Sequence, residues 1–285
     1  MADDGYGWNG GELDLEAYLE RIGYAGDRAP TVDTLRALQR AHTTSIPFEN
    51  LEIMLGRPIP LDLAALQDKM VRSERGGYCY EHTKLFAAAL ERLGFTFTAV
   101  SARVTLGATG ARPATHAALL VTAAGDDRTW LCDVGFGGGP LEPIVFAAGS
   151  EADQDGWRFR LEHRPDNLWA LHQHGAEGWV ERHTFPLTPQ YTIDYVVGNH
   201  FVSTSPRSPF TTRPFAQRFG PKEHHVLDGT TWTTTRPDGS AESREVERAG
   251  VPALLAEVFG ISLDEADAAR LAEGRFATPG SGPAA

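Results

Sequence analysis

The sequence predicts an α+β protein in which helices come first, an antiparallel β region follows and a mixed α/β segment ends the chain. Over residues 12–94 the apolar side chains recur at helical spacing, and from Phe95 they alternate with polar ones, as in strands. The 285 residues, 41% hydrophobic and 22% charged, have an ordinary globular composition with ample length for a core. We therefore divide the chain into residues 1–94, 95–198 and 199–285.

The first region is expected to hold four helices. The second begins after Thr31, a residue type that caps helix N-termini, and the fourth stops at Gly94, as helices commonly do at glycine. Pro47 interrupts the pattern because it favours an extended conformation at Ile46. The expected helices cover residues 12–22, 32–43, 61–71 and 79–93.

The second region is predicted to be antiparallel because short strands follow one another across turn residues. Residues 107–114 form an expected loop within it. The expected strands cover residues 95–104, 116–122, 129–136, 157–161, 168–172 and 179–184.

The last region mixes both structure types. Residues 196–222 are rich in Ser, Thr, Pro and Arg and predict a long, partly irregular connection. The turn Pro237-Asp238-Gly239 predicts a hairpin between the strands 230–235 and 242–247. Two helices, 251–259 and 263–272, are expected to follow, and the Pro- and Gly-rich tail 278–285 is expected to be disordered.

Charge and cysteine content limit the possible partners and locations. The formal net charge of −12 argues against nucleic acid as a general partner. No apolar stretch reaches the roughly 18 residues of a membrane span, and the acidic start lacks the features of a secretory signal. Only two cysteines, without metal-type Cys/His spacing, favour a reducing compartment and no structural zinc. We expect a cytoplasmic protein without a metal.

Cys79 is the first candidate for a nucleophile. It stands at the start of the expected helix 79–93, where free backbone N–H groups and the helix dipole favour a thiolate. The thiolate is the reactive form of cysteine, so the position favours covalent catalysis. Cys132, in an apolar strand, is expected to be an inert core residue, and His82 is expected to have a structural role.

A base and an orienting carboxylate are expected from the hairpin that follows the loop 107–114. If the hairpin folds symmetrically about residues 124–125, Ala118 lies opposite Leu131 and His116 lies opposite Asp133, with Cβ atoms about 5 Å apart. A carboxylate there fixes the tautomer of the imidazole and stabilises its protonated form. A register shift of one residue would separate the two, and the alternative is that both merely end strands at the sheet rim.

Several motifs together resemble the arylamine N-acetyltransferase family, in its bacterial, actinobacterial form. The nucleophile motif is residues 75–82 (RGGYCYEH), and residues 46–51 (IPFENL) are similar to the family's other N-terminal signature. The strand start Thr115-His116 and residues 133–138 (DVGFGG) complete the set, and residues 199–206 are more weakly similar to a later segment. The ordered matches cover residues 46–138.

The resemblance implies a helical bundle, a β-barrel and an α/β lid, and a Cys79–His116–Asp133 triad. It also implies acetyl-coenzyme A as the donor and arylamines, arylhydroxylamines or hydrazines as acceptors. Transfer would run by a ping-pong mechanism through an acetyl group on Cys79.

Further site residues are carried over from the resemblance one position at a time. Glu49 and Arg75 are expected to form a buried structural ion pair, and Thr83 stands where many members have Asn. The acceptor pocket is expected to be lined by Phe48, Val104, Phe136 and Gly137. Candidates for contacts with coenzyme A are Gly135, Ser203, Thr204, Arg207, Arg213, Lys222 and His224.

Other functions remain open at this level. A cysteine hydrolase or a transglutaminase-like enzyme has the same triad order, and an amide synthase that closes a macrolactam could share the fold. A third possibility is a small-molecule binding module without catalysis. The physiological amine, the acyl-chain limit and the oligomeric state are not specified by the sequence.

Overall fold

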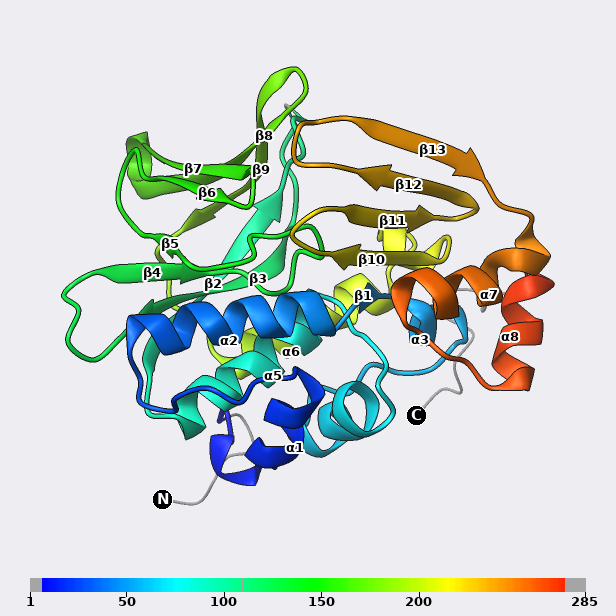
Figure 1. Ribbon diagram of the computed structural model, residues 1–285, viewed down its shortest axis with the longest axis horizontal. Helices are drawn as coiled ribbons and strands as arrows, with labels where there is room; N and C mark the ends of the chain where they lie inside the picture. The colour runs from blue at the N-terminus through cyan, green and yellow to red at the C-terminus, as the bar shows by residue number, and fades with distance from the viewer. Residues whose placement is uncertain (1–6, 109, 275–285) are drawn as a thin grey trace.

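Figure 1 shows the computed structural model, in which helices lie against one side of a β-barrel and a second sheet. The structure describes residues 7–108 and 110–274; the expected disordered tail at 278–285 and the acidic start at 1–6 lie outside them. The predicted α+β class is confirmed.

The helical region is built around α2 (Val32–Ser45) and α5 (Cys79–Arg92), which bury residues along their whole length. Thr31 caps α2 as predicted, because its hydroxyl accepts the N–H of Thr34 at 3.3 Å. Gly94 follows α5 with φ +85°, a conformation that glycine adopts readily. The other helical segments are η1 (Gly10–Glu12), α1 (Leu15–Arg21), α3 (Leu51–Met54), α4 (Leu63–Leu66) and η2 (Gln67–Arg72).

Eight antiparallel strands form the barrel, in the order β5-β4-β3-β2-β9-β8-β7-β6. The meander of the last three predicted strands is confirmed as β7, β8 and β9. The bounds are β2 (Thr96–Val104), β3 (Ala114–Thr122), β4 (Thr129–Cys132), β5 (Ile144–Val145), β6 (Glu151–Gln154), β7 (Trp157–Arg164), β8 (Leu168–Gly175) and β9 (Gly178–Pro186), with η3 (Pro165–Asn167) before β8.

The register expected for the hairpin of β3 and β4 is wrong by two residues. Leu120 lies opposite Leu131 and Thr122 opposite Thr129, so the turn is centred one residue later than expected. The position opposite Asp133 is then Ala118 instead of His116. A shift of two leaves every side chain on its expected face, because the side-chain period of a strand is two.

The long, partly irregular connection expected over residues 196–222 is more regular than predicted, with residues 205–208, 212–214 and 220–222 outside helices and strands. The segment contains the end of α6 (Thr192–Thr204), then η4 (Pro209–Thr211) and β10 (Phe215–Phe219). The β-branched residues of α6 have low helix propensity, but the burial of Tyr195 and Val202 overrides it. The boundary drawn between residues 198 and 199 falls inside this helix.

A second sheet joins distant parts of the chain, in the order β1-β10-β11-β12-β13. Its edge strand β1 (Phe48–Glu49) comes from the helical region and pairs with β10, so that Phe48 lies opposite Gln217. The predicted hairpin is confirmed as β12 (Thr231–Thr235) and β13 (Ala241–Glu245), beside β11 (His224–Asp228). The final segments are η5 (Arg248–Gly250), α7 (Val251–Leu254), η6 (Leu255–Phe259) and α8 (Glu265–Ala272).

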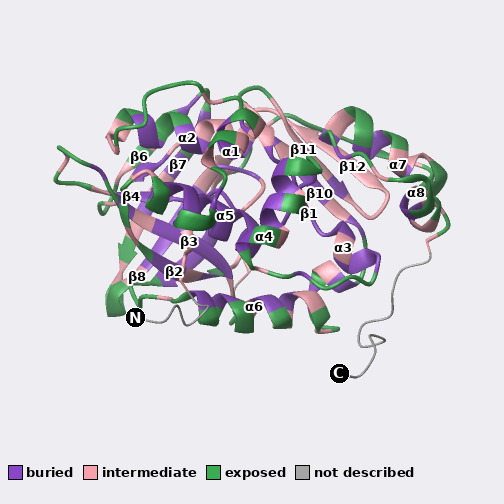
Figure 2. Ribbon diagram, turned by 90° about the horizontal axis from the view of Figure 1, so that it is seen from below, coloured by how far each residue is buried: buried purple, intermediate pink, exposed green. Residues whose placement is uncertain are grey.

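The core has two parts, one under the helices and one inside the barrel. In Figure 2 α5 and the middle of β3 are buried, whereas α6 has one exposed face along the edge of the molecule. Within the described ranges, no helix combines the length and the apolar character that crossing a membrane requires.

Candidate active site

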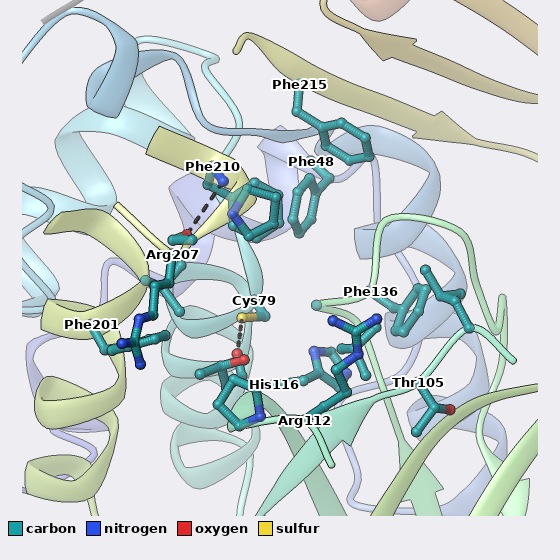
Figure 3. A pocket seen from close by; sticks show the side chains of 18 of the residues that line it. Phe48, Cys79, Thr105, Arg112, His116, Phe136, Phe201, Arg207, Phe210 and Phe215 are labelled. Carbon is teal, nitrogen blue, oxygen red and sulfur yellow. Dashed lines mark hydrogen bonds between the residues drawn. The ribbon is translucent and has the colours of Figure 1, made fainter. Parts of the chain in front are cut away.

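Cys79 is the first residue of α5, and its side chain is buried where the helix meets β3. The thiol donates a hydrogen bond to the Thr115 carbonyl with an Sγ···O distance of 3.4 Å (Figure 3). The N–H groups of Tyr80 and Ala117 also interact with the sulfur. The nucleophile candidate is therefore held between a helix start and a strand.

The strand can hold Cys79 because the first half of β3 has a free edge. β4 pairs with β3 only from Leu119 onward, and a β-bulge leaves Thr115 without an opposite residue in β2. The Thr115 carbonyl is consequently available to the thiol, and the Ala117 carbonyl accepts the Thr83 hydroxyl at 3.2 Å. Bulges commonly redirect groups beside active sites.

His116 and Asp133 form the expected contact despite the different register. His116 Nε2 lies 2.9 Å from Asp133 Oδ2, and both side chains are buried. They are diagonal neighbours across the strand pair instead of directly opposed ones, a separation that long side chains span. Asp133 Oδ1 accepts the N–H of Gly135 at 3.2 Å, which fixes the other end of the carboxylate.

The electrostatics at Cys79 differ from the sequence-based expectation. Burial raises the pKa of the Cys79 thiol, and the negative charge of Asp133 raises it further. The N–H groups of Tyr80 and Ala117 lower this pKa by less. The helix start alone therefore does not make a thiolate, and a buried thiolate here needs a positive charge beside it.

Asp133 is held in its ionised form. Burial on its own raises the pKa of this carboxyl group, but the charge and hydrogen bond of His116 and the hydrogen bond of His183 outweigh it. The net pKa lies well below the usual value for Asp. The carboxylate can therefore only accept hydrogen bonds near neutral pH.

Gly135 packs directly against Cys79. A Cβ atom at this position would lie 2.8 Å from Cys79 Cα and 2.9 Å from the Cys79 carbonyl oxygen. Both are backbone atoms that cannot swing away. The resemblance made Gly135 a candidate for a coenzyme A contact, and the structure shows that it packs against Cys79.

A cavity of about 530 Å³ opens onto Cys79 and His116. Figure 3 shows Cys79 with Phe201 on one side, Phe136 on the other, and Phe48, Phe210 and Phe215 around the remaining wall. Three arginines also line it: Arg112, Arg207 and Arg213. The cavity therefore combines an apolar, aromatic interior with positive charge.

Not all of the predicted acceptor-pocket residues reach this cavity. Phe48, Val104 and Phe136 line it, but Gly137 does not. Gly137 has φ +82°, and a Cβ there would strike the Gln217 amide and lie 2.9 Å from Phe48 Cβ. Its place is in the packing behind the cavity wall.

The predicted coenzyme A contacts divide in the same way. Gly135, Arg207 and Arg213 line the cavity, and Arg213 forms an ion pair with Asp228.

His224 lies behind the wall, where its Nε2–H donates to Gln217 Oε1 at 2.9 Å. Three residues are not among those that line the cavity: Ser203 and Thr204, whose hydroxyls bond to carbonyls within α6, and the exposed Lys222.

Ion pairs join the two N-terminal motifs, as the resemblance suggested. Arg75 Nη2 and Nε lie 2.8 and 2.9 Å from Glu49 Oε1, and Arg75 Nη1 lies 3.0 Å from Glu52. Glu49 Oε2 accepts the N–H of Leu51 at 2.7 Å. This network fixes β1, and with it Phe48, beside the loop that precedes Cys79.

Sequence reasoning missed His183 of β9, whose Nε2 lies 2.9 Å from Asp133 Oδ2. Its strand was predicted, but no local motif marks it. Within the described residues, one cluster of potential metal ligands was found, and it consists of His116, Asp133 and His183. Hydrogen bonds to Asp133 already join the two histidines to it. Arg112 was missed too, because it stands in a segment predicted only as a loop.

Comparison with known proteins places this geometry in a family. The model of the N-acetyltransferase family matches residues 31–268. The arylamine N-acetyltransferase of Mycobacterium tuberculosis is 36% identical over 256 residues, covering 88% of this chain and 90% of that protein.

Solved structures agree with this relationship. The arylamine N-acetyltransferase of Nocardia farcinica is 60% identical, with a TM-score of 0.92 over 95% of this chain and 98% of that one. The Mycobacterium marinum enzyme in complex with CoA is 35% identical, with a TM-score of 0.85 over 92% and 98%. The chain therefore belongs to the family of the arylamine N-acetyltransferases.

Proposed function

We propose that this protein transfers the acetyl group of acetyl-coenzyme A to aromatic amines, arylhydroxylamines or hydrazines through an acetyl group carried on Cys79. One observation carries the proposal: the Cys79 thiol faces an aromatic cavity beside an imidazole that is hydrogen-bonded to a buried carboxylate. Membership of the family supports the same reaction.

The first half-reaction begins with proton transfer from Cys79 to His116. Because His116 Nε2–H donates to Asp133, the lone pair of Nδ1 is the one that can accept the thiol proton. The resulting imidazolium is the positive charge that a buried thiolate requires. The thiolate attacks the acetyl carbonyl, the bond to the coenzyme A sulfur breaks, and that sulfur takes the proton from His116.

The second half-reaction returns the site to its starting state. An amine in the cavity attacks the acetyl-Cys79 carbonyl while His116 accepts the amine proton, and the Cys79 thiol is released when it takes that proton back. Both tetrahedral intermediates carry a negative oxygen. The N–H of Cys79, in the first turn of α5, is a donor for it because that N–H has no carbonyl one turn earlier.

The cavity matches both substrates in chemistry. Phe48, Phe136 and Phe210 offer faces and edges for an arene. Arg112 and Arg207 are exposed, and among the described residues no carboxylate lies within ion-pair distance of either, so both are available for the phosphates of coenzyme A. The M. marinum relative, solved with CoA, supports a coenzyme A site in this fold.

The test is to mix the protein with acetyl-coenzyme A without an amine and measure its intact mass. We expect one acetyl adduct on the peptide that contains Cys79, and its discharge when aniline or a hydrazine is added. Cys79→Ala should form no adduct, and Cys132→Ala, at the buried second cysteine, is the matched control that should still form it. Loss of the acetyl group to water at the same rate with or without amine would identify a hydrolase and refute the proposal.

A further inference from the structure

The carboxylate of Asp133 is shared between two imidazoles, and the second one has no part in the reaction described above. We propose that His183 is a positioning residue: it donates its Nε2–H to Asp133 and holds the carboxylate in the orientation that aligns His116 with Cys79. This inference rests on the proposed Cys79–His116–Asp133 triad and extends it by one residue.

The geometry is that of a clamp around one oxygen. His116 Nε2 and His183 Nε2 each lie 2.9 Å from Asp133 Oδ2, while Oδ1 accepts the N–H of Gly135 at 3.2 Å. His183 is fully buried, and the two imidazole rings are 5.0 Å apart. In the barrel, His116 and His183 lie on opposite sides of β2, which pairs with β3 and β9. The clamp therefore links two barrel strands, β3 and β9, to the segment that follows β4.

The proton positions follow from the acceptor. A carboxylate can only accept, so both imidazoles must donate from Nε2. His183 Nδ1 is then a bare nitrogen, and this buried atom has no hydrogen-bond partner among the described residues. Burial lowers the pKa of His183, and the charges of His116 and Arg182 oppose its protonation, whereas Asp133 favours it. Within these surroundings His183 is a neutral, fixed donor.

This arrangement has a consequence for the triad. With a donor on each side of Oδ2 and one on Oδ1, the carboxylate cannot rotate without losing a hydrogen bond. Removing the His183 donor leaves one hydrogen bond on each oxygen, from His116 and from Gly135, so the carboxylate rotates more readily. The His116 ring is then held less well and its protonated form is less stabilised. The fraction of Cys79 present as thiolate should then fall.

Two substitutions of His183 distinguish the effect of its N–H donor from the effect of its ring. His183→Phe keeps a ring in the buried site beside Phe136 and Phe185 but removes the donor, whereas His183→Gln restores an N–H at a similar reach. We expect acetylation of Cys79 to slow about tenfold to a hundredfold in His183→Phe, as for a lost hydrogen bond to a charged group, and to recover in His183→Gln. His174→Gln, on the neighbouring strand β8 and outside the cavity, is the matched control.

The decisive readout is the pH dependence of Cys79 alkylation by iodoacetamide, followed by mass on the Cys79 peptide. The apparent pKa of the thiol should rise in His183→Phe and return in His183→Gln. An unchanged profile in a folded His183→Phe protein would mean that His183 is only structural, and a fall in the apparent pKa would mean that it tunes the basicity of Asp133; either result refutes the proposal. Alkylation uses neither coenzyme A nor amine, so it tests the clamp even if acetyl transfer fails.

A measurement on the unmutated protein covers the case in which His183→Phe does not fold. Nitrogen-15 NMR of the imidazoles, with His183 assigned by its absence in His183→Gln, should show the neutral Nε2–H tautomer from about pH 5 to pH 8. A proton on Nδ1 over that range would overturn the assignment of His183 as a neutral donor to Asp133.

Discussion

At the residue scale, Cys79 shows how burial and local hydrogen bonds compete. The helix start supplies N–H groups that favour a thiolate, but burial raises the pKa of the thiol by more. The reactive form therefore depends on the exact placement of the sulfur beside His116. A small displacement of Cys79 should cost activity although the fold survives.

Gly135→Ala tests that dependence. The new Cβ would meet Cys79 backbone atoms at 2.8 and 2.9 Å, so the start of α5 and the segment after β4 must move apart. We expect the rate of Cys79 acetylation to fall by about a hundredfold, since a displacement on the order of 1 Å has that effect on aligned groups. Gly11→Ala is the matched control because nothing lies within 4 Å of its Cβ position. Near-normal acetylation in Gly135→Ala would contradict the alignment argument.

The contact between His116 and Asp133 could be predicted from sequence for a physical reason. The hairpin register was misjudged by two, yet His116 and Asp133 still share a face because strand parity survives an even shift. His183 could not be predicted in this way, because it reaches Asp133 from a strand 50 residues away. Contacts across a barrel depend on strand order, which local periodicity does not encode.

At the scale of elements, the contact between α5 and β3 positions Cys79. The bulge at Thr115 and the short pairing of β4 leave two β3 carbonyls, of Thr115 and Ala117, facing the helix. Thr83 binds the second of these one turn after Cys79. The sequence indicated the helix and the strand separately, but a bulge without a glycine or proline has no local signal.

Thr83→Val should loosen this junction. Valine keeps the branched shape but leaves the buried Ala117 carbonyl without its hydroxyl partner, at a cost of about 1–3 kcal/mol in the free energy of unfolding. Acetylation of Cys79 should slow as well, because Ala117 also provides an N–H to the sulfur. Thr83→Ser retains the hydroxyl and should stay close to the unmutated protein in urea unfolding and in acetylation rate. Equal stability of the Val and Ser variants would show that this hydrogen bond is dispensable.

At the scale of the whole molecule, neutral histidines buried in different regions make the fold sensitive to acid. His42 of α2, His82 of α5 and His224 of β11 all have lowered pKa values, chiefly because burial disfavours their charged forms. His82 Nε2–H donates to the Pro47 carbonyl at 3.2 Å, so its Nδ1 must accept from His42 Nε2 at 2.8 Å. This chain of hydrogen bonds ties two helices to the loop before β1.

His82→Gln should reduce the acid sensitivity. The pKa of His82 is about 4 in the folded protein, against about 6.5 when unfolded. Below about pH 6.5 the unfolded chain binds a proton that the folded chain does not, so stability falls with pH by up to about 1.4 kcal/mol per unit for this group. The variant should be less stable near pH 7.5, but about 2 kcal/mol of the loss on going to about pH 5 should disappear in urea titrations. Parallel pH curves for the two proteins would contradict a neutral, buried His82.

The pairing of β1 with β10 also determines when the site is completed during synthesis. Cys79, His116 and Asp133 have all been synthesised while Phe210 and Phe215, which complete the cavity wall, remain to be made. At typical elongation rates that gap is on the order of 10 seconds. A nascent chain thus carries Cys79, His116 and Asp133 for some time without the part of the cavity wall that Phe210 and Phe215 form.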